Sequence, residues 1–210
     1  MYEIKQDAFY DLARQYDPHS EHPLIGEVDC RLLGDDRPYA GVESHREALA
    51  FVFDRLAEES IEDRENTRKE WGDAAAGQLH PLNYDIAGAQ AVPLDPRVFF
   101  YCPNIVRTDR NGNVFYDADW TPNDENIGTT VPYWYALMEP VYGRRNTPED
   151  FRRVNAALFP NGTEPLCICE WTTDWSDYFD DGHEWYGACC WSIYDRSTNR
   201  YAVLLVSATD

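Results

Sequence analysis

The sequence predicts an α+β fold, in which an antiparallel β-sheet, made of a C-terminal three-stranded meander and a central hairpin, packs against two to four α-helices. Three β-prone segments separated by turns, residues 166–172, 184–194 and 200–208, follow one another at the end of the chain. The run 203–206 is apolar on both faces, so we expect the last strand to be central and covered on both sides. Residues 44–59 instead repeat apolar side chains at helical spacing.

The length and composition bound the domain organisation. A chain of 210 residues usually forms one core, and 43% hydrophobic residues suffice to order it. We therefore expect a single domain over 1–210, with a mainly helical N-terminal part over about 1–71. An irregular connection over about 72–96 and a sheet-rich part over about 97–210 follow. Within the first part, 17–42 is rich in Pro, Gly and Asp and predicts a loop.

Two helices are expected in the N-terminal part. Apolar side chains every four residues predict an amphipathic helix over 2–16. The helix over 44–59 is expected to begin at a capping box, in which the Ser44 hydroxyl and the Glu47 carboxylate bind backbone donors. The following residues 60–71 are almost wholly charged, so any helix there lies on the surface.

The middle of the chain predicts strands. The run 98–101 is β-prone, and Asn111-Gly112 favours a tight turn between 104–110 and 113–117. Residues 131–138 are a further strand candidate. No internal repeat or low-complexity segment interrupts this pattern.

A third helix begins at Thr147. This residue is the expected N-cap, Pro148 suits the first turn, and Asp150 can reach back to the cap. Its buried stripe is expected to consist of Phe151, Val154 and Leu158.

The charge restricts the partners that the protein can have. The net charge of −20 comes from 38 acidic and 18 basic residues and is spread along the whole chain. A field of this sign repels nucleic-acid phosphates and anionic lipids, so direct binding to nucleic acid or to a membrane is not expected. It favours cationic ligands and basic protein surfaces. Adaptation to salt or a solubility habit of the host would give the same composition.

The N-terminus lacks the pattern of a secretory signal, and no apolar run approaches the ~20 residues that span a bilayer. We expect a cytoplasmic protein, in which the six cysteines are reduced and mostly buried.

The connection between the first two strands of the meander is the candidate binding site, because loops held by a sheet are where binding residues concentrate. It places acidic side chains beside aromatic rings, which attract arginine and lysine and also suit stacking on sugars. The candidate binding residues are Trp171, Asp174, Trp175, Asp177, Tyr178, Asp180, Asp181, His183, Glu184 and Trp185.

Three other interpretations of this loop stay open. The aromatic rings could simply cover the sheet edge while the acids keep the loop hydrated. A carbohydrate could stack on the rings. Oxygen ligands of the loop suit calcium or magnesium, but no known metal-binding pattern fits, so we expect no metal and no cofactor.

The cysteines of the meander do not have zinc-ligand spacing. Cys167 and Cys169 lie on one face of their strand, whereas Cys189 and Cys190 point to opposite faces of the next. A register that places Cys167 opposite Cys189 is one possibility. Buried core thiols are the expected outcome, and a catalytic cysteine stays open only because its histidine partner would meet it in space.

The absence of a nucleotide-binding glycine loop, a nucleophile elbow and a zinc-protease helix disfavours an enzyme. We expect a non-enzymatic interaction module from a bacterium, which docks on a basic protein as immunity proteins, inhibitors and nucleic-acid mimics do. The alternative is a hydrolase or carbohydrate-binding protein with its site in the acidic and aromatic loop over 171–185.

Overall fold

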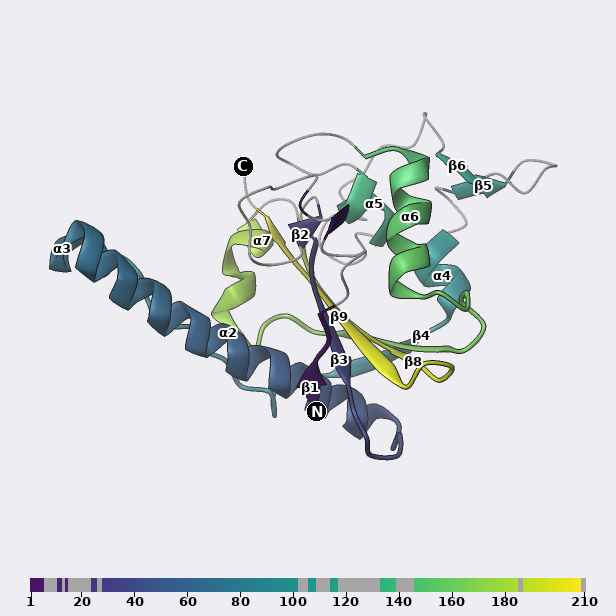
Figure 1. The fold of residues 1–210 in the computed structure, drawn as a ribbon, viewed down its shortest axis with the longest axis horizontal. Helices are drawn as coiled ribbons and strands as arrows, with labels where there is room; N and C mark the ends of the chain where they lie inside the picture. The colour runs from purple at the N-terminus through teal and green to yellow at the C-terminus, as the bar shows by residue number, and fades with distance from the viewer. Residues whose placement is uncertain are drawn as a thin grey trace.

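A computed structural model describes most of the chain (Figure 1). The described residues are 1–5, 11–12, 14, 24–25, 28–101, 106–108, 114–116, 133–138, 146–184 and 187–208.

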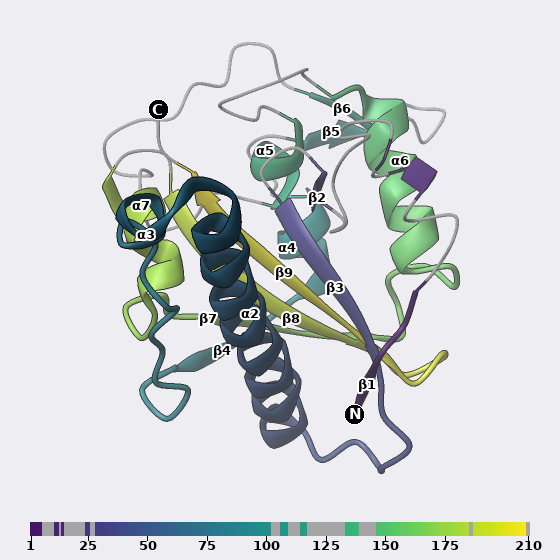
Figure 2. The same ribbon diagram turned by 60° about the vertical axis from the view of Figure 1, so that its left-hand side comes forward.

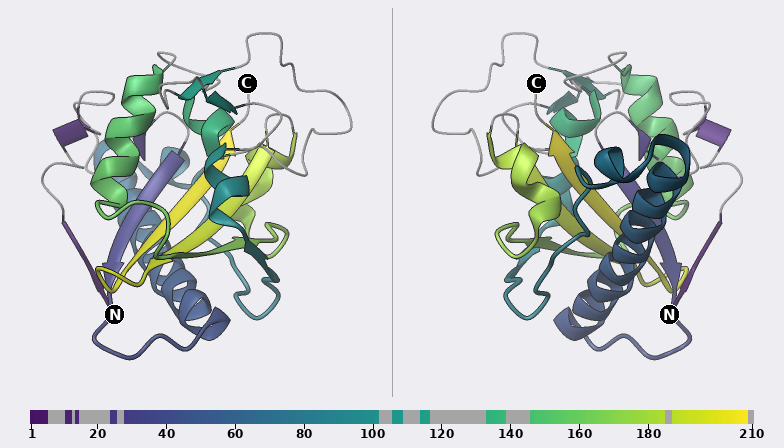
Figure 3. Two further views of the ribbon diagram at one scale, coloured as in Figure 1. Left: turned by 90° about the vertical axis from the view of Figure 1, so that its right-hand side faces the viewer. Right: turned by 90° about the vertical axis from the view of Figure 1, so that its left-hand side faces the viewer.

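An antiparallel sheet forms the centre of the fold, and seven strands of the described residues belong to it, in the order β1-β3-β9-β8-β7-β4, with β2 also paired to β3. Helices cover both faces of the sheet (Figure 3). The predicted α+β class with an antiparallel sheet is thereby confirmed. The strands are β1 (Tyr2–Glu3), β2 (Leu24–Ile25), β3 (Val28–Gly34), β4 (Ala91–Leu94), β7 (Leu166–Trp171), β8 (Gly187–Asp195) and β9 (Arg200–Ala208).

The last three strands lie beside one another in chain order. β7 pairs with β8 so that Cys167 faces Tyr194, and β8 pairs with β9 so that Trp191 faces Leu204. The register that would place Cys167 opposite Cys189 is therefore wrong. β9 lies between β3 and β8 and is buried almost throughout, so the prediction that it is central and covered on both sides is confirmed.

Strand β3 corrects the prediction of a loop over 17–42. Every residue of Val28–Gly34 is buried, and the strand pairs with β9 along its whole length. Its charged residues, Asp29 and Arg31, made the segment resemble a loop. They are nevertheless placed at alternate positions and face one side of the sheet, where Arg31 meets a carboxylate of a helix.

The N-terminus also differs from the prediction. Tyr2–Glu3 is strand β1 and not the start of a helix over 2–16, and Ile4 N–H donates to the Leu32 carbonyl at 2.8 Å. Because β1 to β4 all precede residue 97, the sheet draws strands from the parts of the chain expected to be helical and irregular.

Side chains alternate between two cores, one on each face of the sheet. Helices α4 (Pro96–Tyr101), α5 (Tyr133–Met138) and α6 (Pro148–Leu158) cover the first face, where Trp191 and Leu204 are buried. Helix α2 (Val42–Trp71) covers the second with Leu49 and Phe53. The core on the second face reaches the loop after β7 and positions it.

Helix α2 is longer than predicted and begins differently. It starts after Gly41, whose φ is 71°, and Ser44 and Glu47 lie inside it, so the predicted capping box is wrong. The Ser44 hydroxyl accepts from Ala40 N–H at 2.8 Å, and Glu47 pairs with Arg37 at 2.7 Å. The charged residues 60–71 continue the helix at the surface, as predicted. In Figure 1 the distal end of α2 extends away from the strands, and Figure 2 shows the helix crossing in front of the sheet.

Two predicted strands are helices. Residues 98–101 belong to α4 and 133–138 form α5. Short apolar runs fit a buried helix as well as a strand, and here helical packing on the sheet decides the outcome. Pro96 supplies a helix start and lacks the N–H that a strand would use. The Phe99 ring stacks on Tyr133 with centroids 4.7 Å apart, and both meet Trp191.

Helix α6 is confirmed in detail. Thr147 and Asp150 form a reciprocal capping box, with Pro148 in the first turn. The predicted stripe of Phe151, Val154 and Leu158 is buried.

Four further small elements of the described chain lie between helices α2 and α6. The short strands β5 (Val106–Thr108) and β6 (Val114–Tyr116) pair in a separate two-stranded sheet, while Asn111-Gly112 lies outside the described residues. Helix α3 (Asp73–Ala76) and strand β4 lie within 72–96, which the sequence predicted to be irregular. None of the described helices is both long enough and apolar enough to cross a bilayer.

Candidate functional site

The candidate loop between β7 and β8 is held against residues 83–90. Asp85 N–H donates to the Trp175 carbonyl at 2.7 Å, and Asp177 N–H donates to the Asn83 carbonyl at 3.1 Å. At the other end of the contact, Thr172 N–H donates to the Gln90 carbonyl at 3.0 Å. Two segments that are distant in the sequence therefore form one surface.

The aromatic rings of the loop point inward. The Trp175 ring packs edge-on against Phe53 of α2, with centroids 4.5 Å apart, and is only 6% exposed. Phe179, at the end of the 3-10 helix η1 (Asp177–Phe179), is fully buried, and Tyr178 is partly buried. These rings fasten the loop to the core and leave little ring face open to a ligand.

Trp171 lies at the end of β7 and is also buried. Its indole N–H donates to the Ser192 hydroxyl at 2.7 Å, and the Arg46 guanidinium lies 5.1 Å from the ring centroid. Arg46 in turn donates to the carbonyls of Ile86 and Ala89, so it joins α2 to the segment beside the loop.

The carboxylates of the loop point outward. Asp174, Asp177, Asp180 and Asp181 are all exposed. Asp177 differs from the others because both of its carboxylate oxygens accept from Asn83 N–H, at 3.0 and 3.1 Å.

Three predicted site residues follow in or after α7 (Asp180–Glu184). His183 is exposed and its Nε2 lies 2.7 Å from the Thr173 hydroxyl. Glu184 ends the helix, and Trp185 lies outside the described residues.

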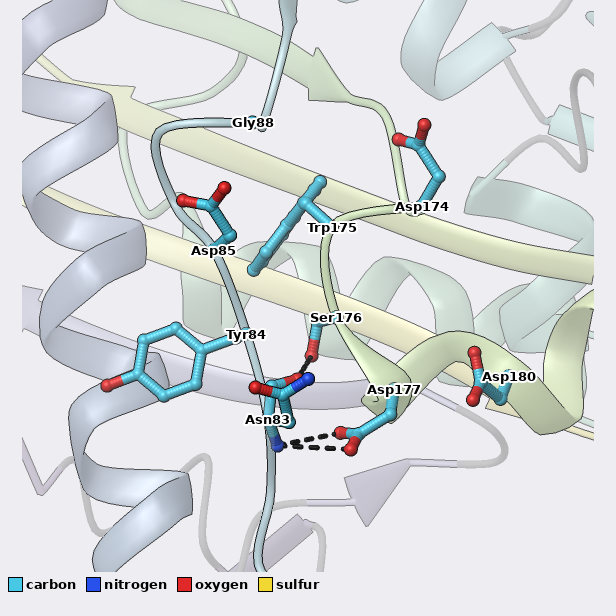
Figure 4. Close-up of a pocket in the computed structure, with 9 residues that line it drawn as sticks. All are labelled: Asn83, Tyr84, Asp85, Gly88, Asp174, Trp175, Ser176, Asp177 and Asp180. Atoms are coloured by element: carbon cyan, nitrogen blue, oxygen red, sulfur yellow. Dashed lines mark hydrogen bonds between the residues drawn. The ribbon is translucent and has the colours of Figure 1, made fainter.

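A hollow of about 460 Å³ lies where the loop meets residues 83–88 (Figure 4). Asp85 and Asp174 stand on opposite sides of the Trp175 ring in this view, and Asp180 lies further along the loop. Four of its lining residues are acidic and none is basic. The lining consists of Asn83, Tyr84, Asp85, Gly88, Asp174, Trp175, Ser176, Asp177 and Asp180.

Residues 83–88 are the part of this surface that the sequence does not reveal. They lie in a stretch without periodicity, and only the folded chain brings Tyr84 next to Ser176, in an antiparallel bridge. The Tyr84 hydroxyl donates to Asp54 of α2 at 2.5 Å. That hydrogen bond raises the pKa of Tyr84 to about 12, so the phenol stays protonated and cannot act as a base near neutral pH.

The chemistry available in the hollow is charge recognition. Within the described ranges, no group of three or more His, Cys, Asp or Glu side chains is arranged to hold a metal ion. The described cysteines lie elsewhere. Cys30 and Cys189 are buried on the first face of the sheet, Cys169 and Cys190 are buried on the α2 face, and Cys167 is partly buried beside them. Burial raises the pKa of Cys190 and Cys169, which favours the inert thiol form.

A second polar cluster, formed by His45 of α2, Tyr39 and Ser192 of β8, lies between the helix and the sheet. His45 is fully buried; its Nδ1 lies 2.9 Å from the Ser192 hydroxyl and its Nε2 lies 3.0 Å from the Tyr39 hydroxyl. Burial lowers the pKa of His45 to about 4. Ser192 is buried as well. The contact between His45 and Ser192 therefore joins helix α2 to strand β8, and a substrate cannot reach either side chain.

The fold and the hollow together define an α+β protein with an antiparallel sheet and an acidic surface site beside one sheet edge. Comparison with protein-family models, with curated proteins and with solved structures finds no significant match.

Proposed function

We propose that the protein is a non-enzymatic interaction module of the bacterial cytoplasm, which docks on a basic protein through the surface around the hollow. Its mode of action would be that of an immunity protein, an inhibitor or a nucleic-acid mimic. The observation that carries the proposal is the sign of the charge: Asp85, Asp174, Asp177 and Asp180 line one concave surface without a basic residue.

The rigidity of this surface supports the proposal. The loop is attached to residues 83–90 by backbone hydrogen bonds, and Trp175 anchors it in the core. A surface that is already ordered loses little conformational entropy when a partner binds, which favours affinity. Exposed carboxylates at its rim also speed association with a positively charged partner.

The experiment is affinity capture from host lysate on the immobilised protein at about 50 and about 150 mM salt, because charge-driven association weakens as the salt concentration rises. The test variant carries Asp85→Asn, Asp174→Asn and Asp180→Asn, and leaves Asp177 in place because it binds Asn83. The control variant removes the same charge from exposed positions of α2, with Glu43→Gln, Glu62→Gln and Asp63→Asn.

We expect the wild type and the control variant to retain a basic protein that the test variant loses. Direct binding of the purified partner, measured by calorimetry, should then weaken at least about tenfold in the test variant. Recovery of no basic protein at either salt concentration, or equal loss in both variants, would contradict the proposal.

The alternative function is a hydrolase or carbohydrate-binding protein. It is supported by the concave shape of the site and by the presence of Tyr84 and Trp175 in its lining. The low exposure of Trp175 argues against stacking on a sugar. Binding of neutral oligosaccharides, abolished by Tyr84→Ala and unaffected by salt, would favour this alternative over the interaction module.

A further inference from the structure

One wall of the hollow is a tight turn over residues 85–89, which we call the Asp85 turn. Gly88 N–H donates to the Asp85 carbonyl at 2.9 Å, and in Figure 4 the chain bends between these two residues. The Asp85 carboxylate accepts from Ala87 N–H at 3.1 Å. The direction of this carboxylate in the hollow therefore depends on the conformation of the turn.

A side chain of helix α2 binds the backbone of the Asp85 turn. Nη1 of Arg46 donates to the Ile86 carbonyl at 2.7 Å and to the Ala89 carbonyl at 2.9 Å. The Ile86 carbonyl also accepts from Ala89 N–H at 3.2 Å. Hydrogen bonds from a charged donor are stronger than those between neutral groups, so this one guanidinium holds two carbonyls of the turn firmly.

Arg46 is itself held in place by buried groups. Its guanidinium lies over the Trp171 ring, 5.1 Å from the centroid, and Trp171 is only 3% exposed. The indole N–H of Trp171 donates to the Ser192 hydroxyl, which also contacts His45, the residue before Arg46. Because the ring has a fixed orientation, the planar guanidinium that stacks on it has less freedom to leave the two carbonyls.

The other contacts of the turn do not replace Arg46. The turn is attached on either side to the segment after β7, through the backbone of Asp85 and of Gln90. Between these attachments, Arg46 alone among the described residues reaches the turn backbone from outside it with hydrogen bonds. The buried Ala89 side chain adds apolar contact, which has no preferred direction.

We propose that Arg46 is a positioning residue for the acidic surface: it holds the carbonyls of Ile86 and Ala89 and thereby keeps the Asp85 carboxylate in the orientation that binds a basic partner. This inference rests on the proposed function of the hollow and adds a residue that lies outside its lining. A carboxylate that is already oriented loses less conformational entropy when the partner binds.

The positioning role and the charge of Arg46 have opposite effects on binding. Loss of one positive charge makes the net charge more negative than −20, which would strengthen the attraction for a basic partner if only overall charge mattered. Loss of the two hydrogen bonds releases the turn and should weaken binding instead. The direction of the change in Arg46→Met therefore distinguishes the two effects.

The first test is backbone hydrogen exchange measured by NMR. In Arg46→Met the amides of Gly88 and Ala89 should exchange at least about tenfold faster than in the wild type, while the amides of strand β9 keep their rates. Arg46→Lys keeps the charge but loses the planar group, so it should accelerate the same two amides to a smaller extent. This variant also serves if Arg46→Met does not fold.

The matched control is Arg55→Met. Arg55 lies on the same helix and pairs with Glu58 at the surface, so its removal changes the net charge equally. Exchange in the Asp85 turn should not change in this variant.

The second test measures, by calorimetry, the binding of the basic protein that affinity capture recovers. Arg46→Met should weaken binding at least about fivefold, whereas Arg55→Met should not weaken it. Because Arg46 acts through Asp85, the double variant Arg46→Met/Asp85→Asn should lose clearly less than the sum of the two single losses.

Unchanged exchange in the turn would overturn the proposal. Equal acceleration in the turn and in β9 would overturn it as well, since it would show a loss of stability in the whole fold. So would fully additive losses in the double variant. If capture recovers no basic protein, the proposed function fails, and the exchange rates still decide whether Arg46 positions the turn.

Discussion

The guanidinium of Arg31 on β3 donates two parallel hydrogen bonds to the carboxylate of Glu59 on α2, at 3.1 and 3.0 Å. It also pairs with Asp29 at 3.3 Å, and the Arg31 side chain is only 5% exposed. Burial alone would lower the pKa of Arg31, but the two carboxylates outweigh it and raise that pKa. The pair thus attaches the middle of α2 to strand β3 of the sheet.

Removal of this guanidinium should be strongly destabilising. Arg31→Met leaves the carboxylates of Glu3, Asp29 and Glu59 close together in a poorly hydrated place, and we expect the free energy of unfolding to fall by about 3–5 kcal/mol. Arg55→Met is the matched control, since Arg55 pairs with Glu58 at the surface and should cost no more than about 1 kcal/mol. Urea unfolding measures both. Equal losses in the two variants would mean that the buried pair has no special role.

The buried His45 should make stability depend on pH. Its pKa of about 4 in the folded state lies below the value of about 6.5 in an unfolded chain, so the unfolded state binds more protons between these pH values. The stability that neutral His45 contributes is fully present above pH 6.5 and is lost as the pH falls toward 4. From pH 7 to pH 5 the loss should be about 2 kcal/mol.

This contribution is isolated by comparing wild type with His45→Gln, which retains polar atoms but does not titrate. The free energy of unfolding of the variant should fall about 2 kcal/mol less between pH 7 and pH 5 than that of the wild type. His183→Gln, at an exposed position, should follow the wild type. If His45→Gln shows the full wild-type dependence on pH, the neutral buried histidine is not its source.

The sequence predicts elements whose signals are local. The start of α6 is one, because Thr147, Pro148 and Asp150 act on backbone groups within one turn. Strand β3 was missed because Asp29 and Arg31 resemble loop residues until Glu59 of α2 is placed beside them. The candidate site likewise has one part that the sequence predicts and one part that it does not. Its acidic residues after β7 were predicted, whereas Asp85 joins them only through contacts between distant segments.

The capping box of α6 allows a direct measurement of such a local signal. The Thr147 hydroxyl accepts from Asp150 N–H, and the Asp150 carboxylate accepts from Thr147 N–H at 2.8 Å. Thr147→Ala should lower the free energy of unfolding by about 1 kcal/mol, and Thr147→Ser, which keeps the hydroxyl, should cost much less. Chemical denaturation distinguishes them. A serine variant as unstable as the alanine variant would show that the hydroxyl is not what matters.

Among the strands that the structure describes, β4 is the last at one edge of the sheet, and it contains Pro93. Gln90 directs its carbonyl toward Thr172 on the β7 side, so by alternation Val92 and Leu94 also turn their backbone polar groups toward β7. Pro93 therefore faces away from β7, and the N–H that it lacks would have pointed to solvent. A proline in this position hinders the addition of another strand.

Pro93→Thr should expose a complete strand edge without disturbing the pairing with β7. We expect the free energy of unfolding to change by less than about 1 kcal/mol, because no existing hydrogen bond is lost. Light scattering on incubation at high concentration should nevertheless show faster aggregation than in the wild type. Pro81→Thr, in the segment that returns along α2, controls for the loss of a proline elsewhere and should not aggregate faster. Equal aggregation rates in the two variants would show that Pro93 does not protect this edge. If only Pro93→Thr aggregates faster, the backbone N–H that proline lacks at this position is what prevents another strand from pairing with β4.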